Sequence, residues 1–332
     1  MVANKKFKFN YIKKGIILLV LCFLMVVLVC YPNVYLDSCY KGITLWAVIV
    51  LPSLLPFFFL TALFTATGVL SKICSPLDKT AKTLFNLKGI AFYCFFMSIL
   101  SGYPVGSKII SELYEKGYIN EGESSRCAIL ASTSGPLFTI GAVGIAMFNS
   151  KVLGIIIYVC HVLGAFLTAI LFRNYGKKPD QNFKLYTSSQ VNNALYESMY
   201  SSVVSCLLVG GFISVFYVFA EIATNFNLLI FIEKLLFLPL KSVENGNGIA
   251  KAFTYGLIEC TRGAKNLSLF GANAITVSLT TALCSFGGIS IIMQSIVFLS
   301  KAKVKLSIFF LQKGLQMIIS FVLSFVLTLI FY

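Results

Sequence analysis

The sequence predicts an all-α polytopic membrane protein, arranged as an inverted repeat of two half-bundles. Each half is expected to contain a re-entrant helical hairpin and a broken transmembrane helix. The chain is 58% hydrophobic and only 12% charged, whereas about 25% of a soluble domain is charged. Its apolar runs are long enough to cross a bilayer. Two runs in each half are interrupted by small, polar and helix-breaking residues, a pattern typical of secondary transporters.

Residues 1–40 are expected to form a basic N-terminal segment and the first transmembrane helix. The uncharged run from Gly15 to Tyr31 follows several lysines. No small-residue cleavage site comes after it, so we expect a retained span and not a signal peptide. The residues from Pro32 to Lys41 are expected to be a short outer loop.

Residues 41–172 are expected to form the first repeat. The apolar run over 89–100 is too short to cross the bilayer, so it is expected to turn back as a hairpin. The elements, in order, are a span over 43–66 kinked by Pro52 and Pro56, a hairpin over 89–116 entered from the cytoplasm, a span over 127–148 broken at 132–136, and a span over 152–172.

Residues 173–197 are expected to be a cytoplasmic linker, and residues 198–332 the second, inverted repeat. Its elements, in order, are a span over 198–220, an outer interfacial helix within 228–240, a hairpin over 248–270 broken at 259–265, a span over 275–299 broken at 284–288, and a last span over 306–331.

The distribution of basic residues orients this arrangement. The loops assigned to the outside carry only Lys41, Lys151, Lys234 and Lys241, and the other loop cations fall on the cytoplasmic side. The N-terminus is therefore expected in the cytoplasm. The net charge of +15 is explained by this orientation, so we expect a lipid bilayer and no nucleic acid as partner.

No enzyme chemistry is indicated. The ten cysteines contain no C-x-x-C pair and lie mostly in apolar runs, so we expect no disulfide framework and no metal site. The triplet Gly106-Ser107-Lys108 lacks the spacing and the preceding strand of a phosphate loop. We expect no cofactor, and the coupling ion stays open.

The four breaks are the expected substrate site, because unwound chain survives in hydrocarbon only where it is buried in protein or lines a wet cavity. The alternative is a set of packed kinks in which hydroxyl groups bond to their own backbone. The candidate substrate-binding residues are Ser101, Gly102, Tyr103, Gly106, Ser107, Lys108, Ser132, Thr133, Ser134, Gly135, Glu259, Thr261, Arg262, Lys265, Ser285, Gly287 and Gly288.

The cations among these residues point to a small anionic substrate, most simply a carboxylate. Lys108, Arg262 and Lys265 lie in or beside the hairpin turns, and charges within the membrane usually face a pathway. Arg262 can bind a carboxylate with two hydrogen bonds. The alternatives are an Arg262–Glu259 pair at i, i+3 and a Lys108 side chain that extends to the interface.

Three other polar residues have simpler expectations. His161, in the middle of its span, is expected to make a packing hydrogen bond between helices in preference to serving as a proton relay. Glu259 is the better candidate for a coupling site, although pairing with Arg262 is its alternative. Lys313 lies near the cytoplasmic end of the last span and is expected to extend into the interface.

The chain from about residue 40 onward also resembles a known family, the YlbJ-type sporulation integral membrane proteins (stage V sporulation dipicolinate transporters). The resemblance lies in three blocks: Leu51–Phe58 (LPSLLPFF), Ser101–Lys108 (SGYPVGSK) and Ser132–Phe138 (STSGPLF). It implies Gate (nucleoside-recognition) domains and transport of dipicolinic acid into the forespore across the outer forespore membrane. The alternatives are a non-transporting scaffold for spore assembly and a nucleoside or purine permease. A homo-oligomer or sporulation membrane proteins are possible further partners.

Overall fold

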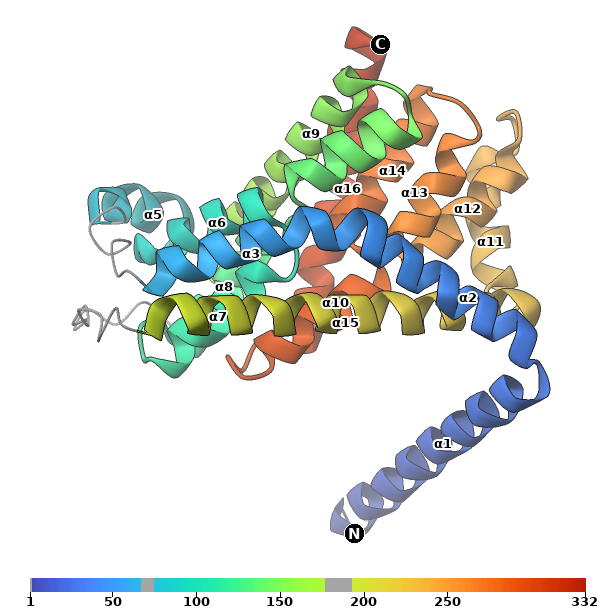
Figure 1. The fold of residues 1–332 in the computed structure, drawn as a ribbon, viewed down its shortest axis with the longest axis horizontal. Coiled ribbons are helices and arrows are strands. Elements are labelled where there is room, and N and C mark those ends of the chain that lie inside the picture. Colours follow the sequence, from blue (N-terminus) through green and yellow to red (C-terminus); the bar gives the residue numbers. More distant parts are fainter. Residues whose placement is uncertain (1, 67–74, 177–192) are drawn as a thin grey trace.

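The computed structural model describes residues 2–66, 75–176 and 193–332, and all regular structure in these ranges is helical (Figure 1). Four described segments are long and apolar enough to cross a membrane, and a bent helix pair at the N-terminus adds a fifth if it counts as one span. This confirms the predicted all-α polytopic membrane protein. The four segments are α9 (Lys151–Leu171), α10 (Ala194–Asn225), the bent unit α14–α15 (Ala274–Leu299) and α16 (Leu306–Phe331).

The N-terminal region departs from the expected pattern. Helix α1 (Val2–Cys30) meets α2 (Pro32–Leu45) at a bend of 100°, and α2 continues through a π-helical segment (Trp46–Val50) into α3 (Leu51–Ala66). The outer loop expected up to Lys41 is therefore wrong, and the expected boundary at residue 40 falls inside a helix. Pro32 suits the first turn of α2, and the Asp37–Lys41 ion pair at 2.6 Å has helical spacing.

The first repeat contains the two predicted breaks. One hairpin is interrupted at 102–104 and the next helix at 131–136. The broken helix begins at Glu121, before the expected position, because Asn120 forms a capping box with Glu123. The elements are a 3₁₀ turn (Ser75–Leu77), α5 (Asp78–Phe85), α6 (Ile90–Ser101), α7 (Val105–Glu115), α8 (Glu121–Leu130), the π-helix η3 (Leu137–Met147) and α9.

The second repeat follows the same order, although its breaks are shorter. The second hairpin is interrupted at Glu259 alone, and the next helix at Gly287, because residues 284–286 stay helical. Arg262 and Lys265, expected in the break, lie within a helix. The elements are α10, α11 (Ile230–Phe237), a 3₁₀ turn (Leu238–Leu240), α12 (Gly246–Ile258), α13 (Cys260–Ser268), α14 (Ala274–Phe286), α15 (Gly288–Leu299) and α16.

Packing places the unbroken helices against the broken ones. Helix α16 runs along α14 and α9, and α9 in turn packs on η3 and α14 (Figure 1). Helices α2 and α3 pack along α10 on another side. There Trp46 lies against Gly210 and donates its indole N–H to the carbonyl oxygen of Cys206 at 3.0 Å. Each half therefore presents hairpin, broken helix and unbroken helix in the same order. Their opposite orientation in a membrane stays a prediction.

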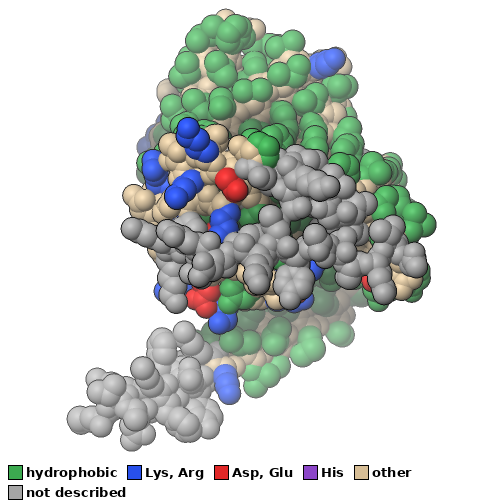
Figure 2. Space-filling model, turned by 90° about the vertical axis from the view of Figure 1, so that its left-hand side faces the viewer, with side chains coloured by type: hydrophobic (Ala, Val, Ile, Leu, Met, Phe, Trp, Pro, Cys, Tyr) green, Lys and Arg blue, Asp and Glu red, His purple; other side chains and the backbone are tan. Residues whose placement is uncertain are grey.

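Charged side chains gather at one end of the molecule. Figure 2 shows the end that carries α5, where Lys and Arg side chains lie among apolar ones. Lys303 of the α15–α16 turn pairs with Glu121 at 3.1 Å, and Lys301 lies 3.9 Å from Glu115. The Glu121 hydrogen bond raises the pKa of Lys303 above its ordinary value. The chain segments in this group are those expected in the cytoplasm.

Candidate functional site

The breaks of the two halves meet one another. The Ser134 hydroxyl, in the α8–η3 break, donates to the carbonyl oxygen of Cys284 near the end of α14 at 3.3 Å. Tyr103, in the first hairpin turn, donates its hydroxyl to the carbonyl oxygen of Ser285 at 3.3 Å. Gly288 lies against the second hairpin turn, since a Cβ there would be 3.1 Å from the backbone nitrogen of Cys260. Residues far apart in the sequence thus form one central cluster.

Glycines allow the backbones to approach closely at this point. A Cβ on Gly102 would lie 2.6 Å from the backbone nitrogen of Gly135, and one on Gly106 would lie 2.0 Å from the carbonyl oxygen of Ala131. Gly102 also has φ 79° and ψ −170°, a region that is essentially restricted to glycine. These glycines pack the first hairpin onto the α8–η3 break. In the second half, Gly287 ends α14 in the left-handed region, with φ 87°.

Hydroxyl groups join the packed breaks. Ser98 and Thr133 share a hydrogen bond of 2.8 Å, and so do Thr61 and Ser101. The backbone nitrogen of Thr133 also donates to the Ser98 hydroxyl at 3.2 Å. These side chains are buried, so the bonds hold α3, α6 and the break together. Ser107, likewise buried, lies in the first turn of α7.

His161 links both broken helices. Its Nε2 accepts a hydrogen bond from the backbone nitrogen of Ser134 at 2.8 Å, and its Nδ1 lies 3.0 Å from the Ser285 hydroxyl. Because Nε2 is an acceptor, the neutral ring carries its hydrogen on Nδ1 and donates to Ser285. Gln316 donates to the carbonyl oxygen of His161 at 3.3 Å. His161 therefore makes the interhelical packing bonds expected of it.

The positive charge at the centre of the cluster is that of Lys313, a residue expected from the sequence to lie at the membrane interface. Lys313 is 0% exposed, so the expectation that it extends into the interface is wrong. Its ammonium donates to the Tyr103 hydroxyl at 2.6 Å, to the carbonyl oxygen of Ser132 at 3.1 Å and to Oε1 of Gln316 at 2.7 Å. The ammonium also lies 4.9 Å from the centre of the Tyr103 ring. The physical reason is that α16 packs with this face toward the breaks, which supply oxygen acceptors.

The predicted cations have other partners. Arg262 pairs with Glu221 of α10 at 2.9 Å, and the alternative i, i+3 pair with Glu259 is not among the described ion pairs. The buried Glu259 carboxylate instead caps α13, accepting from the backbone nitrogens of Thr261 at 3.2 Å and Arg262 at 2.7 Å. Lys108 is half-buried and donates to Ser201 on α10.

Among the described contacts, the Lys313 side chain donates hydrogen bonds at the breaks, and the side chains of the three predicted cations do not. Lys265 is exposed in the last turn of α13. Substrate contacts by Lys108, Arg262 and Lys265 stay a prediction.

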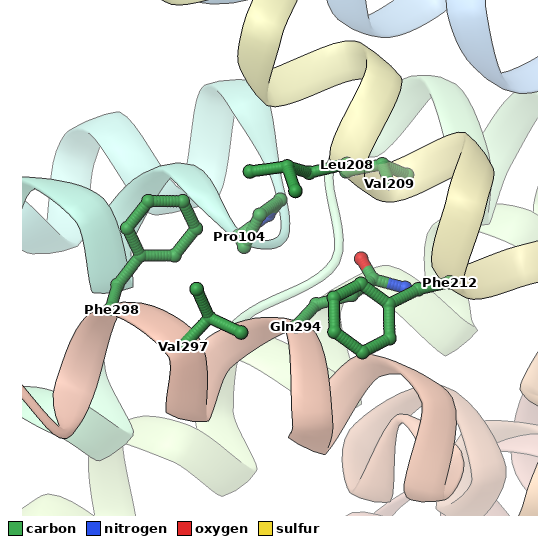
Figure 3. A pocket seen from close by; sticks show the side chains of 7 residues that line it. All are labelled: Pro104, Leu208, Val209, Phe212, Gln294, Val297 and Phe298. Atoms are coloured by element: carbon green, nitrogen blue, oxygen red, sulfur yellow. The ribbon is translucent and has the colours of Figure 1, made fainter.

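A small cavity borders the first hairpin turn. It lies between Pro104 at the turn, apolar side chains of α10 and the α15 residues Gln294, Val297 and Phe298 (Figure 3). The empty space there is about 170 Å³ and is partly open to solvent. It is lined by no charged side chain and has no enclosed room for an aromatic anion, so the charged cluster around Lys313 is the better candidate site.

Comparison with known proteins gives one relative. The chain is 26% identical over 316 residues to the sporulation integral membrane protein YlbJ of Bacillus subtilis (strain 168), an alignment that covers 89% of this chain and 78% of that protein. No protein-family model matches the chain, and no solved structure does. The Gate domain therefore stays a prediction. The long alignment agrees with the helical membrane architecture and with the three sequence blocks, so the chain is similar to this sporulation integral membrane protein over most of its length.

Proposed function

We propose that this chain is a secondary transporter that carries a small organic anion across a membrane during sporulation. The proposed substrate is dipicolinate, moved into the forespore across the outer forespore membrane by alternating access. The observation that carries the proposal is the meeting of four helix breaks from both halves around a buried cation. The proposed role in sporulation rests on the similar Bacillus subtilis protein, which is a sporulation integral membrane protein.

The helix ends at the breaks suit an anion. Helices α7, η3 and α15 begin at a break, so their N-terminal N–H groups and positive dipole ends are directed toward it. The start of α13 is already capped by the Glu259 carboxylate. The central side chains add further hydrogen-bond donors, namely the Tyr103 and Ser134 hydroxyls and the Lys313 ammonium. A carboxylate accepts hydrogen bonds only. The donor-rich centre therefore matches the chemistry of dipicolinate.

The contacts between the halves suit a moving element. Three side chains join the first repeat to α14 by hydrogen bonds: the Tyr103 and Ser134 hydroxyls donate to backbone carbonyls at 3.3 Å, and His161 bonds to the Ser285 hydroxyl at 3.0 Å. A neutral hydrogen bond contributes about 1 kcal/mol net. Breaking all three costs about 3 kcal/mol, an amount that binding of one ligand can offset. In the proposed cycle, the hairpins separate from the α14 break alternately toward each side of the membrane.

Uptake of labelled dipicolinate into liposomes that contain only the purified protein tests the proposal. Protein-free liposomes are the baseline, and unlabelled nucleosides and purine bases are added as competitors. We expect uptake above the baseline that dipicolinate inhibits and nucleosides do not. Uptake equal to the baseline would favour a non-transporting scaffold, and strong competition by nucleosides would favour a nucleoside permease.

A further inference from the structure

Lys313 is a buried cation for which the described part of the chain provides no acidic partner. Its ammonium is fully buried, and its three hydrogen bonds end on neutral oxygen atoms of Tyr103, Ser132 and Gln316. The ion pairs of the described residues do not include it. A charge within the membrane is expensive, and the common solutions are a carboxylate partner or a place on a ligand pathway.

Of the other candidate cations, Lys108 donates to Ser201 on α10, Arg262 has an acidic partner and Lys265 lies at the surface. The charge of Arg262 is balanced by Glu221 at 2.9 Å. Lys265 is exposed, so water screens its charge. Lys313 alone among these cations contacts the turn of the first hairpin and the α8–η3 break together, through Tyr103 and Ser132.

We propose that Lys313 is the residue that selects the negative charge of the substrate: its ammonium binds one carboxylate group of the transported anion, and the Tyr103 hydroxyl donates a second hydrogen bond to the same group. This inference rests on the proposed transport function and names the charge that the site recognises. In the arrangement described above, the Ser132 carbonyl and the Gln316 amide occupy acceptor positions that the carboxylate takes over.

The exchange is chemically balanced. Lys313 gives up two neutral acceptors and gains a carboxylate, so the attraction between opposite charges is added to its hydrogen bonding. Tyr103, which donates to the Ser285 carbonyl over a long 3.3 Å, gains a charged acceptor in its place. Since that bond joins the hairpin turn to the α14 break, its loss on substrate binding would free the hairpin to move. The Tyr103 hydroxyl would thus both bind the substrate carboxylate and, without substrate, join the two halves of the protein.

A binding experiment on the solubilised full chain tests the inference. The probes are pyridine-2-carboxylate and its uncharged analogue pyridine-2-carboxamide, measured by calorimetry with wild type, Lys313→Gln, Lys313→Arg and the control Lys305→Gln. Lys305 lies exposed at the start of the same helix, so its substitution removes an equal charge away from the breaks. Each variant must first elute as a single species with a cooperative thermal transition, and Lys313→Met replaces Lys313→Gln if the latter does not fold.

We expect wild type and Lys305→Gln to prefer the carboxylate over the carboxamide by about 10- to 100-fold. Lys313→Gln (or Lys313→Met) should reduce this preference to about twofold or less, whereas Lys313→Arg should retain most of it. A merely structural role would weaken both probes equally, so an unchanged preference in the neutral variants overturns the inference. A wild type without any preference for the carboxylate overturns it as well. Dipicolinate uptake is scored separately: a wild type that shows the Lys313-dependent preference but no uptake refutes the transport proposal and supports the charge assignment.

Discussion

Replacing Gly102 with alanine tests whether the hairpin turn is held against the α8–η3 break by direct backbone contact. Gly102 has φ 79° and ψ −170°, and a Cβ there would lie 2.6 Å from the backbone nitrogen of Gly135. The nearest atoms of Gly135 belong to the main chain, so no side chain can rotate to make room. The hairpin turn must therefore move away from the break or accept strain.

Two terms set the expected size of the effect. Backbone strain in a region restricted to glycine costs about 1–3 kcal/mol. Forcing an extra methyl group into a packed contact costs about 1–3 kcal/mol more. The Gly102→Ala variant should therefore lose about 2–6 kcal/mol of stability. The control is Gly141→Ala, whose Cβ would meet nothing within 4 Å, and helix propensity changes by only about 1 kcal/mol there, in favour of alanine.

The measurement is the apparent thermal midpoint in detergent, with dipicolinate uptake measured in parallel. We expect a clear fall in the midpoint for Gly102→Ala together with loss of uptake, and a midpoint at or above that of wild type for Gly141→Ala. The reasoning is refuted if Gly102→Ala unfolds at the same temperature as the control, because the close approach of the two backbones would then not exist in the folded protein.

Two further pairs of variants test contacts of α10. Gly210→Ala places a Cβ 2.5 Å from the Trp46 ring and should lower the thermal midpoint. A Cβ on Gly211 would meet nothing within 4 Å, so Gly211→Ala should leave the midpoint unchanged or raise it. Equal midpoints for the two variants would contradict the packing of α2 and α3 on α10. Arg262→Gln leaves Glu221 without its cation, so it should destabilise the protein by about 1 kcal/mol, and Glu221→Gln added to it should restore most of that loss. Dipicolinate uptake distinguishes a structural role of Arg262 from a substrate contact. If uptake recovers in the double variant, Arg262 serves only in the ion pair with Glu221. If uptake stays low, Arg262 also contacts the substrate, as the sequence predicts.

The positions of the breaks could be predicted from the sequence, because glycine, proline and hydroxyl residues within apolar runs have few physical explanations. Both interruptions of the first repeat lie where the residue types indicate, at 102–104 and 131–136. The extent of the helices was harder to predict. The polar segment after Pro32 was expected to be a loop on the basis of its charges, yet Asp37 and Lys41 are spaced to pair on one face of a helix. Charge alone therefore marks where a chain leaves hydrocarbon, and it does not mark where a helix ends.

The assignment of Lys313 shows which part of the site needs tertiary structure. A lysine near the end of an apolar run is compatible with a side chain that extends to the interface, and its partners Ser132 and Tyr103 are 181 and 210 residues away in the sequence. One local signal was nevertheless present. Lys313 belongs to a buried polar stripe on α16, repeated at about every fourth residue, that comprises Gln312, Lys313, Gln316, Ser320, Ser324 and Thr328.

Such a stripe costs free energy on a lipid-facing surface, so its presence predicts that this face of the last span is turned inward. Helix α16 does pack with this face toward α14 and α9. A cation on that face cannot reach the interface and must be satisfied inside the bundle, as Lys313 is by Tyr103 and Ser132 of the breaks and by Gln316 of its own helix. The periodicity of polar residues along a span is therefore a stronger guide to the location of an intramembrane charge than its distance from the end of the span.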